Sequence, residues 1–152
     1  MTALQCFEGG CHCGNLTVRF ETAIAPSAFT VRACGCSFCR RHGTRTVADP
    51  AGRMQITVRD PAKLSRYRFG LRTADFLVCR ECGVYLGAVH HGDGGSYGLV
   101  NTWALAARAA FGQPATPTDH DAETEPARRA RRRATWTPTT FDPPLAADRA
   151  RA

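Results

Sequence analysis

Residues 79–83, Cys-Arg-Glu-Cys-Gly, place two thiols three positions apart and follow them directly with a glycine. Glycine relieves the tight backbone after the second thiol, and a Cys-x-x-Cys-Gly turn is a common half of a zinc site. A single turn of this kind is weak support for a metal, because a tetrahedral ion takes four ligands. The other ligands would have to come from distant parts of the chain.

Two more cysteine clusters precede this turn. They are Cys11-His12-Cys13 and Cys34-Gly35-Cys36-Ser37-Phe38-Cys39, and only Cys6 among the eight cysteines stands apart. Thiols so close in sequence do not readily form disulfides with each other, whereas several of them can converge on one ion. Three clusters in one chain therefore predict metal binding much more strongly than one cluster does.

The spacing leaves open which clusters combine. The first cluster can join the third in a four-thiolate site, which leaves Cys34, Cys36 and Cys39 as a trio. Alternatively, the first cluster can join part of the second. The first arrangement uses whole clusters and ties the start of the chain to its middle. Four thiolates close the coordination sphere of zinc, whereas three leave an open position of the kind at which zinc chemistry usually occurs.

Length and composition are typical of one globular domain, with 152 residues of which 43% are hydrophobic. The longest apolar runs are too short to span a bilayer, and the first residues lack a signal-peptide pattern. We therefore expect a cytoplasmic protein. In that reducing compartment, clustered cysteines indicate metal or redox sites rather than disulfides.

The net charge of +7 is unevenly distributed, because residues 1–118 carry +6 and residues 119–152 carry +1. The arginines at 128–133 follow a run of acids, so the local charges largely offset each other and a nucleic-acid partner is not expected. Acids early and arginines late suit the dipole of a solvated helix over 121–134. We expect a zinc-binding β domain at 1–118, with residues 119–152 forming a charged C-terminal helix and tail packed on it or extending from it.

Short alternating segments predict a mainly β fold. Leu16, Val18 and Phe20 alternate with polar residues, as in a half-buried strand. The spacing of such segments favours antiparallel sheets rather than βαβ units. A Gly-rich loop at 91–95 is expected to be a hairpin turn, and 103–111 a short helix. The further expected strands are 29–31, 44–48, 54–58, 64–69, 76–78, 84–89 and 97–100.

Three motifs resemble those of the glutathione-dependent formaldehyde-activating enzymes and the related centromere protein V group. The first is Gly-Gly-Cys-His-Cys-Gly at 9–14, followed by a strand. The second is Cys-Gly-Cys-Ser-Phe-Cys-Arg-Arg at 34–41, and the third is Phe-Leu-Val-Cys-Arg-Glu-Cys-Gly at 76–83. The seven clustered cysteines match in order, and the resemblance covers roughly residues 9–110.

The resemblance implies a zinc-stabilised antiparallel β-tent with short helices toward the C-terminus. It also implies two zinc ions, a structural one on Cys11, Cys13, Cys79 and Cys82 and a catalytic one on Cys34, Cys36 and Cys39. The implied activity is that of a zinc-dependent carbon–sulfur lyase-type enzyme handling a thiol–aldehyde adduct. The implied reactants are glutathione as co-substrate and formaldehyde, which together give S-hydroxymethylglutathione. The alternative is a non-catalytic zinc-stabilised binding module whose basic surface meets an acidic partner or nucleic acid.

The residues around the trio support a chemical role independently of the resemblance. An open zinc on three thiolates is a weak Lewis acid, and its better use is to bind an incoming thiol as thiolate. Arg40 and Arg41 follow Cys39 and can offset negative charge or hold a substrate carboxylate. His42 is a possible fourth ligand that would close the site. The remaining candidates are not expected to take part in the chemistry. His12 should point away from the metal, His90 and His91 should be exposed where a strand ends beside the Gly-rich loop, and Cys6 should be buried.

Overall fold

Alternating burial builds the central strands of the sheet. The computed structural model describes residues 2–146. In β2 (Leu16–Thr22) and in β5 (Arg53–Val58), every second side chain is buried and those between are exposed or half-buried. Successive side chains of a strand point to opposite faces, so this alternation gives each strand one apolar face. The two strands pair antiparallel, with Val18 opposite Ile56.

Within residues 2–146, eleven strands form one branched sheet in the order β1-β2-β5-β11-β9-β4-β3-β10, and β8, β7 and β6 extend it from β9. The protein is therefore mainly β, as predicted. The other strands are β1 (Gln5–Gly10), β3 (Arg32–Cys34), β4 (Thr46–Val47), β6 (Leu64–Tyr67), β7 (Asp75–Cys79), β8 (Tyr85–Gly92), β9 (Gly95–Asn101), β10 (Thr116–Thr118) and β11 (Thr137–Asp142). Gly92 and Gly95 pair at the end of the β8–β9 hairpin, which confirms the predicted turn.

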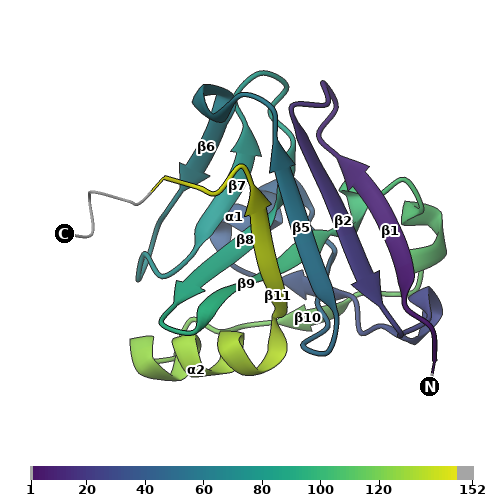
Figure 1. Ribbon diagram of the computed structural model, residues 1–152. Coiled ribbons are helices and arrows are strands. Elements are labelled where there is room, and N and C mark those ends of the chain that lie inside the picture. Colours follow the sequence, from purple (N-terminus) through teal and green to yellow (C-terminus); the bar gives the residue numbers. More distant parts are fainter. Residues whose placement is uncertain (1, 147–152) are drawn as a thin grey trace.

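The C-terminal segment contributes a strand to the middle of the sheet. After α2 (Glu125–Thr135), β11 inserts between β5 and β9 (Figure 1). It runs parallel to β5 and antiparallel to β9. The pair β10 and β3 is also parallel, so the sheet is mixed where only antiparallel pairs were expected. Parallel pairing needs a long connection, which neither local pattern nor turn residues reveal.

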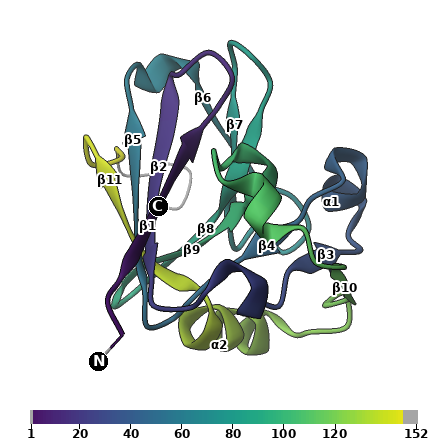
Figure 2. The same ribbon diagram turned by 90° about the vertical axis from the view of Figure 1, so that its right-hand side faces the viewer.

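The helical elements are short and lie around the sheet. Figure 2 shows β2 and β5 on one side of the molecule, α1 (Ser37–His42) on the opposite side and α2 at the base. The expected helix at 103–111 is two 3-10 helices, η3 (Thr102–Ala104) and η4 (Arg108–Phe111). Two further 3-10 helices are η1 (Pro26–Ala28) and η2 (Pro61–Lys63). None of the helices in the described residues is long and apolar enough to cross a membrane.

Three expectations about single residues are wrong. Cys6 is exposed, because β1 pairs only with β2 at one end of the sheet. His90 and His91 lie near the end of a strand, β8, but neither is exposed as expected, and His91 is half-buried. His90 is fully buried, with Nδ1 at 2.9 Å from the Thr73 carbonyl oxygen. The part of the expected tail beyond residue 146 lies outside the described residues.

Candidate metal centres and active-site cavity

The first and third cysteine clusters meet in space. The sulfurs of Cys11, Cys13, Cys79 and Cys82 all lie within 4.8 Å of one another. Cys11 and Cys13 lie in the turn between β1 and β2, Cys79 ends β7, and Cys82 lies in the turn between β7 and β8. Gly83 has a φ of 79°, a conformation that favours glycine directly after the second thiol. The whole-cluster pairing favoured by the sequence is therefore the one that the fold produces.

The spacing of these four sulfurs fits zinc. Cys13 Sγ lies 3.7 Å from Cys11 Sγ and 3.6 Å from Cys79 Sγ. With Zn–S bonds of about 2.3 Å, the edge of a tetrahedron of sulfurs is about 3.8 Å. Four thiolates and no other donor form the ligand set of a structural site. The Leu16 amide also donates to Cys11 Sγ at 3.2 Å, which orients that sulfur.

The second cluster forms a separate group of three thiols. Cys34 ends β3, Cys36 is the N-cap of α1 and Cys39 lies in the first turn of that helix. The Cys39 amide donates to Cys36 Sγ at 3.4 Å, and Gly43 ends the helix in a left-handed conformation. The three sulfurs lie within 4.8 Å of one another, and no fourth His, Cys, Asp or Glu in residues 2–146 joins them.

The three thiols strongly perturb one another. A hydrogen bond from Cys39, against the opposing effect of burial, lowers the pKa of Cys34 to about 5. The same contact and burial raise the pKa of Cys39. Of the three, Cys39 is buried and the other two are half-buried. Neighbouring thiols that share protons in this way suit a divalent cation, which would take all three as thiolates.

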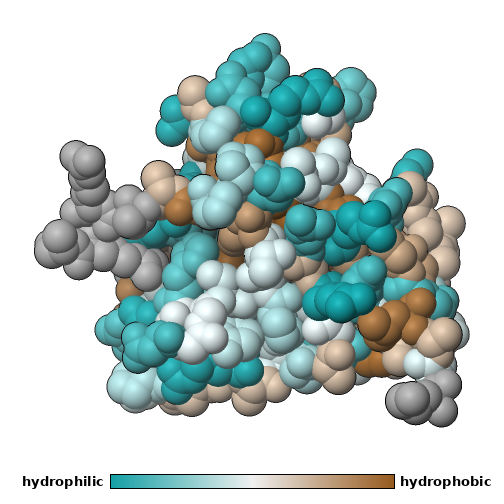
Figure 3. Space-filling view, viewed as in Figure 1, coloured by the Kyte–Doolittle hydropathy of each residue, from teal (hydrophilic) through white to brown (hydrophobic). Residues whose placement is uncertain are grey.

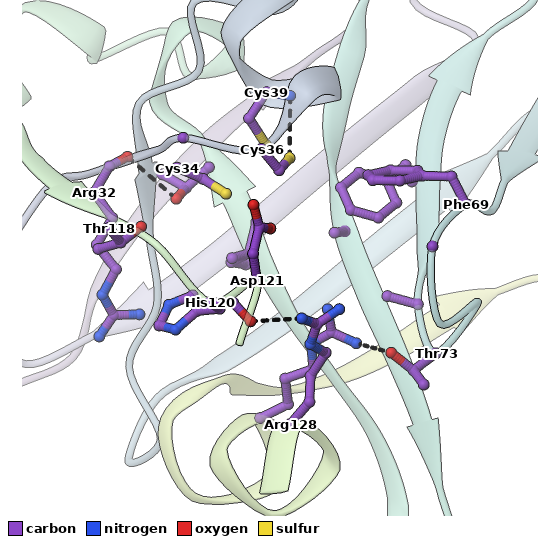
Figure 4. A pocket seen from close by; sticks show the side chains of 18 of the residues that line it. Arg32, Cys34, Cys36, Cys39, Phe69, Thr73, Thr118, His120, Asp121 and Arg128 are labelled. Atoms are coloured by element: carbon purple, nitrogen blue, oxygen red, sulfur yellow. Dashed lines mark hydrogen bonds between the residues drawn. The ribbon is translucent and has the colours of Figure 1, made fainter. Parts of the chain in front are cut away.

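The trio lies in the wall of a cavity of about 350 Å³ (Figure 4). Aromatic residues line one side, among them Phe69, Phe76 and the fully buried Tyr85. Burial and the nearby thiols raise the pKa of Tyr85 well above its ordinary value. In Figure 4 the carboxylate of Asp121 points toward the thiols. A cavity of this size falls in the range of small-molecule binding sites.

The base of the cavity comes from α2 and the segment before it. Arg128, Arg131 and Arg132 line it together with His120. Arg132 is only 7% exposed, and its guanidinium stacks over Trp136 at 4.8 Å. Figure 3 shows hydrophilic residues over the outer side of the molecule at α2, so the prediction of a solvated helix describes only one of its faces.

The sequence reasoning missed these cavity residues. Arg128, Arg132 and Trp136 are spaced by four residues, which puts them along one side of a helix. That spacing was the available signal, but the neighbouring acids suggested surface ion pairs. Some of those pairs exist: Arg129 contacts Glu125 at 2.8 Å and Arg131 contacts Glu123 at 2.8 Å.

The other candidate residues divide between the cavity and the surface. Arg40 lines the cavity, whereas Arg41 donates from Nη1 to the Ser37 carbonyl oxygen at 2.8 Å on the outside of α1. The His42 ring packs against Phe38, with ring centres 4.5 Å apart, and stays outside the thiol group. His12 also lies outside both groups of thiols.

Comparison with known proteins agrees with this arrangement. Residues 6–118 match the family model described as glutathione-dependent formaldehyde-activating enzyme. The chain belongs to this family. A search of curated proteins found no match. The crystal structure of a Rhodobacter sphaeroides protein, a structural genomics target, is similar with a TM-score of 0.54 and 30% identity, covering 73% of this chain and 99% of that one.

Membership of the glutathione-dependent formaldehyde-activating family connects the site to a glutathione- and formaldehyde-related function. The match contains all seven clustered cysteines and ends at residue 118. Both thiol groups therefore lie in the part of the chain that the family shares, whereas α2 and its arginines lie beyond it.

Proposed function

We propose that this protein is a zinc-dependent carbon–sulfur lyase-type enzyme that forms or cleaves a thiol–aldehyde adduct, such as S-hydroxymethylglutathione from glutathione and formaldehyde. The observation that carries the proposal is the three-thiol group, without a fourth ligand from the described residues, in the wall of a cavity of about 350 Å³. The family match supports the same reactants.

Cys34, Cys36 and Cys39 would hold the catalytic zinc, and the four-thiol group would hold a structural one. When bound, the catalytic zinc would supply a coordination position that favours the thiolate form of an incoming thiol. In the overall reaction a C–S bond forms between the thiol sulfur and the aldehyde carbon. The C=O bond becomes a single bond, and the proton lost by the thiol ends on the aldehyde oxygen.

The residues of the cavity would guide this addition. Asp121 would accept the thiol proton on a carboxylate oxygen and return it to the aldehyde oxygen, since its carboxylate points toward the thiols (Figure 4). Phe69 and Phe76 would exclude water from the reacting carbon. Arg40 in the cavity, with Arg41 behind it, would offset the net negative charge of a zinc held by three thiolates.

The first test is metal content together with activity. We expect two zinc ions per chain in the wild-type protein and one in Cys36→Ser. The variant should also lose the acceleration of S-hydroxymethylglutathione formation over the spontaneous reaction. The measurements are elemental analysis and the rate of adduct formation from glutathione and formaldehyde, followed by NMR with a protein-free control. Cys6→Ser is the matched control, because Cys6 is exposed and belongs to neither thiol group.

Two results would contradict the proposal. One is a wild-type protein with a single zinc whose second cluster reacts freely with thiol reagents. The other is a Cys36→Ser protein that forms the adduct at the wild-type rate.

Asp121→Asn tests whether the Asp121 carboxylate carries the proton from the thiol to the aldehyde oxygen. It should lower kcat at least about 100-fold without changing the zinc content.

A further inference from the structure

Two arginines of α2 line the cavity whose wall contains the three thiols. Arg128 and Arg132 are one helical turn apart and both line the cavity. In Figure 4 the guanidinium of Arg128 lies between His120 and Thr73, on the side of the cavity opposite Cys36 and Cys39. The helix thus brings two guanidinium groups to the far end of the cavity from the sulfurs.

Both guanidinium groups have unused hydrogen-bond donors. Arg132 donates from Nη1 to Thr73 Oγ1, and Arg128 donates from Nη2 to the His120 carbonyl oxygen at 2.6 Å. The Nε of each is buried and has no hydrogen-bond partner, although Arg128 Nε forms an ion pair with Glu123 at 3.5 Å. Within residues 2–146, no hydrogen bond involves Nη2 of Arg132 or Nη1 of Arg128 either. Because both residues line the cavity, these Nη atoms are the donors that a ligand in the cavity would meet.

Within the described part of the chain, Arg128 shares one counter-charge with Arg131, and Arg132 has none. No carboxylate of residues 2–146 lies within ion-pair distance of Arg132. Glu123 is engaged by Arg131 through two hydrogen bonds, at 2.8 and 2.9 Å, and approaches Arg128 Nε only at 3.5 Å. Burial and the neighbouring charges of Arg131 and Arg128 lower the pKa of Arg132 to about 10. An anion in the cavity would relieve this repulsion.

The balance of charge in the cavity wall favours an anion. Its lining includes five arginines, at 32, 40, 128, 131 and 132, against one carboxylate, that of Asp121. In Figure 4 the Asp121 carboxylate is directed toward the thiols and away from Arg128. The cavity therefore has a sulfur-binding end and a cationic end.

We propose that Arg128 and Arg132 form an anion subsite that binds a carboxylate of the thiol substrate while its sulfur lies at the three-cysteine group. Guanidinium groups match carboxylates in shape and charge. The subsite makes the enzyme selective for thiols that carry a carboxylate over neutral thiols. Its residues lie beyond the family match at 6–118, so this selectivity belongs to α2 of this chain. The proposal rests on the proposed function for the identity of the reacting thiol.

The test uses S-methylglutathione, which keeps both carboxylates of glutathione and has no free thiol. Its affinity for the zinc-loaded full chain is measured by calorimetry. We expect Arg128→Gln to weaken binding about 10-fold, the effect of losing a hydrogen bond to a charged group. The dimethyl ester should bind the wild-type protein about 10-fold more weakly than the free acid does. Because Arg132 is buried, Arg132→Gln can also change the stability of the fold. The test of the subsite therefore relies on Arg128→Gln.

Arg133→Gln is the matched control. It removes the same charge from the same helix at an exposed position that does not line the cavity, and it should change the affinity less than about 2-fold. The subsite is overturned if S-methylglutathione does not bind the wild-type protein, or if Arg128→Gln weakens binding no more than Arg133→Gln does. If binding depends on Arg128 but the protein does not accelerate adduct formation over the spontaneous reaction, the subsite stands and the proposed function fails.

Discussion

At the scale of single residues, Asp75 is the most constrained ionic group outside the cavity. Its side chain is fully buried and accepts from Arg66 Nε at 2.8 Å, from Arg68, and from His91 Nε2 at 3.1 Å. Burial alone would raise the pKa of Asp75, but the hydrogen bonds from His91 and Arg68 and the charge of Arg66 hold it well below its ordinary value. The carboxylate therefore anchors β7 to β6 and β8 through its charge.

Replacing this carboxylate should destabilise the fold. Asp75→Asn leaves two arginines beside a neutral amide, and we expect the free energy of unfolding to fall by about 3 kcal/mol, as when a buried ion pair loses one partner. Urea denaturation monitored by circular dichroism measures the loss. Asp93→Asn, at an exposed position of the β8–β9 hairpin, should leave the free energy within about 0.5 kcal/mol of wild type. Equal effects of the two substitutions would contradict this role.

The same residue predicts a pH dependence with a definite sign. The pKa of Asp75 is lower in the folded than in the unfolded state, where it is about 4. Its stabilising contribution is thus complete above about pH 4 and declines as the pH falls below that value. The difference in unfolding free energy between wild type and Asp75→Asn should shrink on acidification. Acid also protonates the metal-binding thiolates, but this affects wild type and Asp75→Asn equally and cancels in the difference between them. A difference in unfolding free energy that grows on acidification would contradict the stabilising role of the Asp75 carboxylate.

At the scale of elements, the close approach of β1 to η3 explains the first of the two glycines before the first cysteine cluster. A Cβ at Gly9 would overlap the Ala104 carbonyl oxygen, and Gly9 forms a bridge with Leu105. The atoms that an added Cβ would meet belong to the backbone, so no flexible side chain can move aside to make room for it. The strand therefore needs a glycine at this position for packing.

This contact gives a prediction for β1. Gly9→Ala should lower the free energy of unfolding by about 2 kcal/mol, in the range of overpacked positions. Gly94→Ala is the control, because its added Cβ would meet only Tyr97 Oη, at an ordinary 3.6 Å. Thermal melts of both variants test the difference, and a Gly9→Ala protein as stable as Gly94→Ala would show that β1 can shift away from η3.

At the scale of the whole molecule, the four-thiol group joins two distant parts of the sheet. It connects the turn after β1 to the turn after β7, across 66 positions between Cys13 and Cys79. Structural zinc in such sites contributes folding energy comparable to the total stability of a small domain, about 5–15 kcal/mol. We therefore expect the fold to depend on this metal and not on the one at the trio.

Metal removal should separate the two roles. Cys82→Ser should lose the β-sheet signal in circular dichroism at 25 °C, because the four-thiol site loses a ligand. Cys36→Ser should keep that signal while losing one zinc. A strong chelator should first abolish activity and then, on longer treatment, unfold the wild-type protein. A folded Cys82→Ser protein that contains less zinc would contradict the structural assignment.

Local sequence patterns predicted much of the sheet. The predictions failed where contacts between distant parts of the chain determine the structure. The alternation in β2 and β5 and the hairpin at Gly92–Gly95 follow from periodicity and turn chemistry. By contrast, β11 was not predicted, because its residues become a strand by pairing with β5 and β9. His90 was misplaced for the same reason: its burial depends on β7 and β9, which flank β8.

The sequence by itself determined that seven thiols stand in three clusters with zinc-like spacing and that the strands alternate, because both features are local along the chain. The tertiary structure alone decided which clusters meet, since that depends on how β1, β2, β7 and β8 are placed in the sheet. It also decided that α2 turns Arg128 and Arg132 toward the three-thiol cavity. A charge run is the same in sequence whether it faces solvent or a cavity, and only the packing of the helix against the sheet distinguishes the two.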